Sequence, residues 1–76
     1  MPKLPRPTGK EMVSFRQRKG FTVLRVRGSH HFMAFGDKCT CVPVHANSSL
    51  KIGTLRSILR DIDLKPDAFA QEWFKF

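Results

Sequence analysis

A two-residue turn signal, Gly28-Ser29, is the feature that most constrains the fold of this chain. It separates Thr22–Arg27, which is rich in β-branched residues, from a second strand-like run, His30–Phe35. A two-residue loop that begins with glycine suits a type II′ turn, because the first central residue needs a positive φ. The pattern predicts a β-hairpin in which Arg27 lies opposite His30.

Regular alternation from this register sorts the hairpin side chains into two faces. The further predicted pairs are Val26 with His31, Arg25 with Phe32, Leu24 with Met33, Val23 with Ala34, and Thr22 with Phe35. One face, which we expect to join the core, carries Leu24, Val26, His31, Met33 and Phe35. The opposite face, which we expect to be basic and solvated, carries Val23, Arg25, Arg27, His30, Phe32 and Ala34.

The segments before the hairpin predict a lead-in and a first helix. Residues 1–7 contain three prolines, which favours an extended or frayed lead-in. Thr8 and Glu11 have the spacing of a capping box, in which each side chain bonds the backbone N–H of the other residue. Gly20 follows two basic residues, as is typical of a helix end. We therefore predict a helix over residues 9–19.

The segment after the hairpin predicts a third strand over Cys39–Val44, and Pro43 favours an edge position for it. Its side chains on the core face are Thr40, Val42 and Val44. A polar loop over residues 46–52 follows, and Thr54 is the expected N-cap of a second helix. The apolar stripe of this helix consists of Leu55, Ile58, Leu59 and Ile62.

A short last helix opens at Pro66-Asp67, and its Phe69 and Trp73 are four residues apart. At this spacing aromatic side chains more often close a small core than stack on nucleobases. The order α-β-β-β-α, with the short C-terminal helix, predicts a single α+β domain over residues 8–76. Both main helices have one apolar stripe, so we expect them on the same face of a three-stranded antiparallel sheet.

The charge of the chain indicates which partners to expect. Lys and Arg number 14 and Asp and Glu number 6, which leaves a net charge of +8. Nucleic acid, an anionic membrane surface or an acidic protein are the natural partners of such a charge. Because the apolar runs are too short for a membrane-spanning helix or a signal peptide, we expect a cytoplasmic protein and no membrane partner.

The sequence predicts neither a metal site nor another cofactor. Cys39 and Cys41 are one residue apart, and we interpret them as ordinary strand cysteines. The three histidines, His30, His31 and His45, lack the spacing of zinc ligands. The acidic residues are scattered along the chain, whereas two-metal nuclease chemistry needs clustered carboxylates.

His30 is the candidate catalytic residue, because alternation places it with Arg25 and Arg27 on the uncovered face. A neutral imidazole can accept a proton from an RNA 2′-hydroxyl, and arginines can bind the phosphodiester. A polar hairpin residue without a chemical role is an equally good interpretation from these residues alone. His31, on the core face, is expected to be structural.

Further contacts to phosphate groups are predicted at the start of the second helix. Lys51, Arg56 and the amide groups near Thr54 can attract anions, although a solvated helix face explains the same residues. His45 suits a second acid, a phosphate donor or a loop cap. The predicted RNA-binding set comprises Arg25, Arg27, Gly28, Ser29, His45, Lys51, Thr54 and Arg56.

Four segments together resemble the HicA toxin family, also called YcfA-like. They are Gly20-Phe21, Arg27–His31, Val42–His45 and Lys51–Leu59, and the resemblance runs from about Thr8 to Phe69. It implies a fold like that of double-stranded-RNA-binding domains, and a metal-independent mRNA endoribonuclease that blocks translation. It also implies neutralisation by a HicB antitoxin in a type II toxin–antitoxin pair.

The family's catalytic histidine directly follows Gly-Ser, which corresponds to His30, and its Val-Pro-x-His position corresponds to His45. The two cysteines and the Trp73–Phe76 tail depart from the family pattern. Two other functions compete with catalysis. One is a binding module that recognises double-stranded RNA by shape without cleaving it. The other is a basic surface that serves mainly an acidic protein partner.

Overall fold

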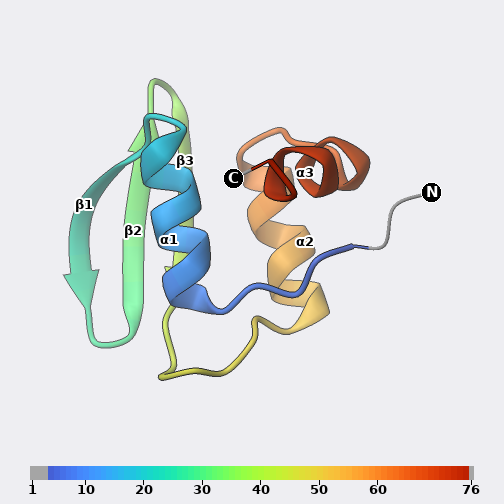
Figure 1. Ribbon diagram of the computed structural model, residues 1–76. Coiled ribbons are helices and arrows are strands. Elements are labelled where there is room, and N and C mark those ends of the chain that lie inside the picture. The colour runs from blue at the N-terminus through green and yellow to red at the C-terminus, as the bar shows by residue number, and fades with distance from the viewer. Residues whose placement is uncertain (1–3, 76) are drawn as a thin grey trace.

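The computed structural model describes residues 4–75 and places all three helices on one side of an antiparallel sheet (Figure 1). In chain order the elements are α1 (Gly9–Arg18), β1 (Thr22–Arg27), β2 (His30–Phe35), β3 (Lys38–Pro43), α2 (Ile52–Asp61) and α3 (Pro66–Trp73). The three strands form a meander in the order β1-β2-β3. The predicted α+β fold, similar to double-stranded-RNA-binding domains, is confirmed. None of the helices described has the length and apolar content needed to cross a membrane.

The ends of α1 follow the predicted signals. Oγ1 of Thr8 accepts the N–H of Glu11 at 3.1 Å, and Oε1 of Glu11 accepts the N–H of Thr8 at 2.9 Å. These two bonds form the capping box and satisfy two backbone donors at the helix start. Gly20, beyond the last turn, has a φ of 102°, and a Cβ there would lie 2.7 Å from the ring of Phe35. The conformation requires glycine at this position, and a side chain there would also displace the ring of Phe35.

The β1–β2 ladder follows the predicted register near the turn and departs from it farther away. Arg27–His30, Val26–His31 and Arg25–Phe32 pair as predicted. The predicted pairs Leu24–Met33, Val23–Ala34 and Thr22–Phe35 are wrong. Val23 pairs with Met33 and Thr22 pairs with Ala34, because Leu24 is an extra residue in a β-bulge.

The bulge also corrects the predicted core face. Leu24 is 65% exposed, whereas Val23 packs against the core. Val26 and Phe35 keep the phase of His31 and Met33, but they are 53% and 51% exposed, so their predicted burial is wrong as well. Alternation counted from the turn places Leu24 on the helix side of the sheet, whereas the packed core takes Val23. The two patterns of alternation therefore differ by one residue at this end of β1. Because Val23 and Leu24 are adjacent and both apolar, their pattern fits either phase.

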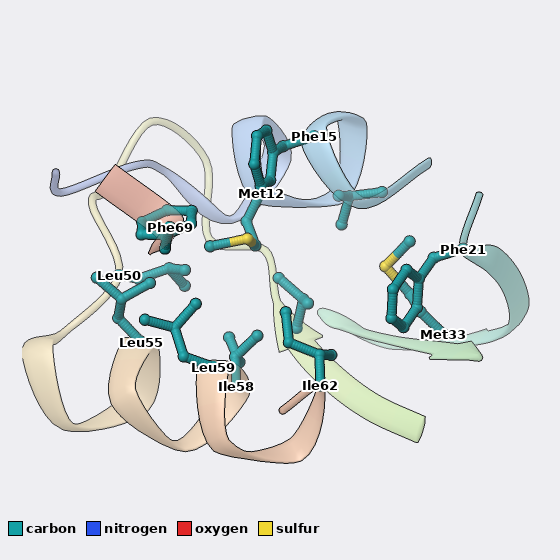
Figure 2. Close-up of a cluster of buried hydrophobic side chains, with 12 residues drawn as sticks. Met12, Phe15, Phe21, Met33, Leu50, Leu55, Ile58, Leu59, Ile62 and Phe69 are labelled. Carbon is teal, nitrogen blue, oxygen red and sulfur yellow. The ribbon is translucent and has the colours of Figure 1, made fainter. Parts of the chain in front are cut away.

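The core lies between α1 and α2 and is closed by α3 and the inner face of the sheet (Figure 2). Met12 projects from α1 toward Leu59 on α2. The predicted stripe of α2 is buried throughout, and the sheet contributes Met33 and Val42. Phe69 is fully buried, with its ring edge-on to Phe15 at a centroid distance of 5.4 Å. Trp73 packs against both rings, so the predicted role of the α3 aromatics in the core is confirmed.

The bounds of three elements differ from prediction, and the first of them, α1, ends at Arg18 rather than at residue 19. β3 begins and ends one residue earlier than predicted, and it is an edge strand, as Pro43 suggested. The prediction of Thr54 as an N-cap is wrong, because α2 begins at Ile52 with Lys51 as its N-cap. No side chain caps this end, and Thr54 lies in the first turn. The early start of α2 therefore had no capping signal in the sequence.

The described part of the lead-in, residues 4–7, is extended and docked on the domain. Leu4 packs against the core and Pro7 is fully buried. The Arg6 guanidinium donates to the carbonyl oxygen of Leu50 from Nη2 at 3.0 Å and from Nε at 3.3 Å. The N–H of Leu50 donates to Pro7 O at 2.8 Å. Residues 1–3 of the predicted lead-in lie outside the described residues.

Arg16 is a buried cation that the sequence pattern did not reveal. It is only 4% exposed, and its guanidinium carbon lies 4.3 Å from the ring centroid of Phe15 and 5.5 Å from that of Phe21. Burial lowers the pKa of Arg16, and the charge of Glu72 partly opposes that shift. Glu72 itself pairs with Lys19 at 2.7 Å. Two aromatic rings are therefore close neighbours of this charge, and cation–π attraction to them partly offsets the cost of its burial.

Replacing Phe69 with alanine should remove a ring that joins α3 to α1. We expect the free energy of unfolding to fall by about 3–5 kcal/mol, which is a large part of the stability of a small domain. Phe74→Ala is the matched control, because Phe74 is 70% exposed and its loss should change stability by less than about 0.5 kcal/mol. Urea denaturation followed by circular dichroism measures both. Equal losses in the two variants would contradict the assigned core.

Candidate functional site

The face of the sheet opposite the helices carries the candidate catalytic histidine. His30 is exposed at the start of β2, where it pairs with Arg27 on β1 and Pro43 on β3. Side chains directly opposite in an antiparallel ladder have Cβ atoms about 4.5–5.5 Å apart, so the guanidinium of Arg27 can reach a group bound at His30. Arg25 is one diagonal step farther along β1. The structure thus brings together Arg25, Arg27 and His30, which alternation along the strands had placed on one face.

The Gly28-Ser29 turn is fixed by its conformation and by a bond to β3. Gly28 has a φ of 61°, and Ser29 is not among the residues with positive φ, as a type II′ turn requires. A Cβ on Gly28 would meet no atom within 4 Å, so conformation alone accounts for glycine here. The carbonyl oxygen of Ser29 accepts the N–H of Val44 at 2.7 Å. This bond joins the turn to the end of the neighbouring strand.

His31 points to the other side of the sheet and has a structural contact. Its Nδ1 lies 3.4 Å from the carbonyl oxygen of Ser29, and the side chain is half-buried. Because a carbonyl oxygen only accepts hydrogen bonds, Nδ1 must carry the hydrogen in this contact. The predicted structural position of His31 at the edge of the core is confirmed.

A hollow of about 360 Å³ adjoins His30 across β3. Pro43, the ladder partner of His30, forms one of its walls. The other lining residues are His45, Ser48, Ser49, Leu50, Lys51 and Thr54. Three predicted RNA-binding residues, His45, Lys51 and Thr54, therefore line one site. It contains the start of α2, where backbone N–H groups without helical partners attract anions.

Arg56 lies apart from this hollow, although it is close to Thr54 in sequence. It lines a separate depression of about 330 Å³ beside α3, together with Arg60 and Lys65. The separation follows from helical geometry, because two residues of helix rotate a side chain by about 200°. Prediction from the sequence also missed Ser48 and Ser49. The available signal in the sequence was the polar loop over residues 46–52, in which both serines lie.

The two cysteines have different surroundings on β3. Cys39 is exposed, whereas Cys41 is half-buried. Burial raises the pKa of the Cys41 thiol, and the negative charge of Asp61 raises it further. Asp61 is held near the strand by the hydroxyl of Thr40, which donates to its Oδ2 at 3.1 Å. Among residues 4–75, no three histidine, cysteine or acidic side chains are grouped as metal ligands.

We expect iodoacetamide to alkylate Cys39 several-fold faster than Cys41 near neutral pH. Only the thiolate reacts, and a raised pKa leaves less thiolate on Cys41 at any given pH. The rate at Cys41 should continue to increase at alkaline pH, as more of its thiol ionises. Fragment-ion mass spectrometry can separate the two sites. Equal rates over the whole pH range would contradict the burial of Cys41.

The residues of this site also fall within a part of the sequence that matches a known protein family. Residues 9–64 match the HicA toxin of bacterial toxin–antitoxin systems, whereas the comparison with curated proteins finds no match. The matched range extends from the start of α1 through the three strands and α2, and it includes the hairpin and the hollow beside it. Because the match covers more than half of the chain, this protein belongs to the HicA toxin family.

Proposed function

We propose that this toxin is a metal-independent endoribonuclease that cleaves mRNA in the cytoplasm and thereby blocks translation. The observation that carries the proposal is the exposed His30, which lies between Arg27 on one neighbouring strand and the His45 hollow beyond the other. The net charge of +8 supports a polyanionic substrate. None of the residues that line the hollow is acidic, so the phosphate backbone meets no opposing charge there.

In the proposed reaction His30 removes the proton from a ribose 2′-hydroxyl. The 2′-oxygen then forms a bond to the adjacent phosphorus, and the bond from phosphorus to the 5′-oxygen breaks. Arg27 and Arg25 bind the non-bridging oxygens and offset the charge that develops on them. His45 is the candidate for protonating the leaving 5′-oxygen or for binding the next phosphate, because it lines the adjoining hollow. The nucleophile belongs to the RNA itself, so this scheme needs no metal-bound water.

His30→Ala should reduce cleavage of mRNA by at least about 10²–10⁴-fold, the range that general acid–base catalysis contributes. The assay uses purified protein with excess EDTA and detects cleaved products by gel electrophoresis. His31→Gln is the matched control, because its amide can still donate a hydrogen bond and its side chain lies on the other face. We expect His31→Gln to retain cleavage.

A competing function is a non-catalytic double-stranded-RNA-binding module, which the similarity of the fold supports. In that case His30→Ala would still arrest growth when expressed, whereas charge reversal at Arg25 and Arg27 would abolish the arrest. This result, together with no cleavage by the unmodified protein in EDTA, would overturn the proposed catalytic function. Loss of both growth arrest and cleavage in His30→Ala would support it.

We further propose that a HicB-like antitoxin neutralises the toxin by covering the basic face around His30. An acidic or groove-filling segment would complement Arg25, Arg27 and Lys51, and it would exclude RNA from the histidine. This type II partner is expected to be encoded beside the toxin gene.

In the complex with the antitoxin, we expect diethyl pyrocarbonate to modify His30 at least about tenfold more slowly than in the free toxin. Covering the imidazole removes it from the reagent, and mass spectrometry of the digested protein measures the rate. Lys65 serves as an internal control, because it lies by α3 outside the proposed contact. A complex in which His30 stays as reactive as in the free toxin would indicate inhibition by another route.

A further inference from the structure

We infer that the uncovered face of the sheet holds a binding site for one unpaired nucleobase of the RNA, centred on Phe32. This inference rests on the proposed ribonuclease function and adds the form of RNA that the site accepts. The face has a hollow of about 510 Å³, lined by Leu24, Arg25, Phe32, Met33, Cys39 and Thr40. Its volume is in the range of about 300–1,000 Å³ that is typical of small-ligand sites.

The β-bulge creates part of this hollow. In the register predicted from the turn, Leu24 pairs with Met33 on the helix side of the sheet. In the structure, Leu24 and Arg25 together oppose Phe32, so the extra residue becomes a wall of the hollow. Leu24 is 65% exposed, and Phe32 is half-buried. An apolar wall thus stands next to an aromatic ring on the face that carries Arg25 and Arg27.

The ring and the cation at this site have the chemistry of base recognition. The guanidinium carbon of Arg25 lies 5.1 Å from the ring centroid of Phe32. Unpaired bases stack on aromatic side chains and on arginine guanidinium planes. Arg25 forms no ion pair within residues 4–75, so its charge is available to a phosphate group.

The lining favours a base over a segment of an acidic protein. None of the lining residues is acidic, and Leu24 and Phe32 provide an apolar surface. A flat, uncharged base can bury its faces there while its phosphates remain near the arginines. A carboxylate in the same place would lose hydration against Leu24 and Phe32 and would be paired only at Arg25.

The position of Phe32 relates the base to the proposed reaction. Phe32 is two residues beyond His30 on β2, and both side chains lie on the same face. The two positions are therefore about 6–7 Å apart along the strand. A nucleotide in the hollow would adjoin the phosphodiester at His30. Because a base within a duplex is paired and stacked, only an unpaired base can enter the hollow.

Binding of single-stranded RNA to the His30→Ala protein tests this inference without cleavage. A set of oligonucleotides, each with one abasic position, locates the base that contributes to binding. We expect one position to weaken binding by about 5- to 150-fold, as for loss of a stacked base. Phe32→Leu should weaken binding of the intact oligonucleotide similarly, and it should cause little further loss with that abasic oligonucleotide. Phe74→Leu, at an exposed phenylalanine outside the site, should leave binding unchanged.

Abasic substitutions and Phe32→Leu that leave RNA binding unchanged would overturn this inference but not the proposed ribonuclease function. Absence of any RNA binding by the His30→Ala protein, together with no cleavage by the unmodified protein in EDTA, would overturn both. If Phe32→Leu weakens binding of the antitoxin but not of RNA, the hollow serves the protein partner and the inference is wrong.

Protection of Cys39 gives a second measurement that keeps Phe32 in place. Cys39 lines the hollow and is exposed, so a bound base should slow its alkylation. In the Cys41→Ala protein, single-stranded RNA should slow the reaction of Cys39 with iodoacetamide at least about fivefold at saturation. A duplex of the same sequence should give little protection. Equal protection by the duplex, or none by the single strand, would contradict the inference.

Discussion

The reversal of the chain at Gly28-Ser29 determines which side chains meet on the uncovered face of the sheet. Its type II′ geometry sets the pairing of Arg27 with His30, and the two side chains therefore share that face. The carbonyl oxygen of Ser29 then accepts the N–H of Val44, which fixes the end of β3 and the start of the His45 loop. A single turn thus positions the proposed base, an arginine on one side of it and the hollow on the other. A change in the turn would displace all three.

One face of the sheet is covered and the other is uncovered because all three helices described pack into a single core on one side. The apolar stripes of α1 and α2 are buried against each other and against one face of the sheet, with α3 closing the cluster. Within the described residues, no helix remains to cover the opposite face (Figure 1). That face can therefore combine arginines, a histidine and an aromatic ring, a combination that would be costly inside the core. The same asymmetry separates residues that provide stability from residues proposed to contact RNA.

Most of the fold was predictable because the signals were local. The Thr8–Glu11 capping box, the two-residue turn and the stripe of α2 each specify an element within a few residues. The bulge at Leu24 was not predictable, because Val23 and Leu24 are both apolar and only the packed core selects between them. The start of α2 was misplaced because its N-cap residue, Lys51, makes no side-chain bond. In the candidate site, alternation grouped Arg25, Arg27 and His30, whereas helical rotation separated Arg56 from Thr54 in a way that proximity in sequence concealed.

The docking of Arg6 and Pro7 on Leu50 has a consequence for the order of folding. The hairpin that carries His30 closes through a two-residue loop, and such hairpins form within about 1–10 μs. The hollow beside it depends on contacts between the lead-in and a residue 44 positions later. Loop-closure entropy disfavours contacts of such long range until other parts of the chain have already come together. A nascent chain that has emerged only through β3 therefore carries the histidine without the wall formed by Leu50 and Lys51, and the site becomes complete only after α2 has been synthesised.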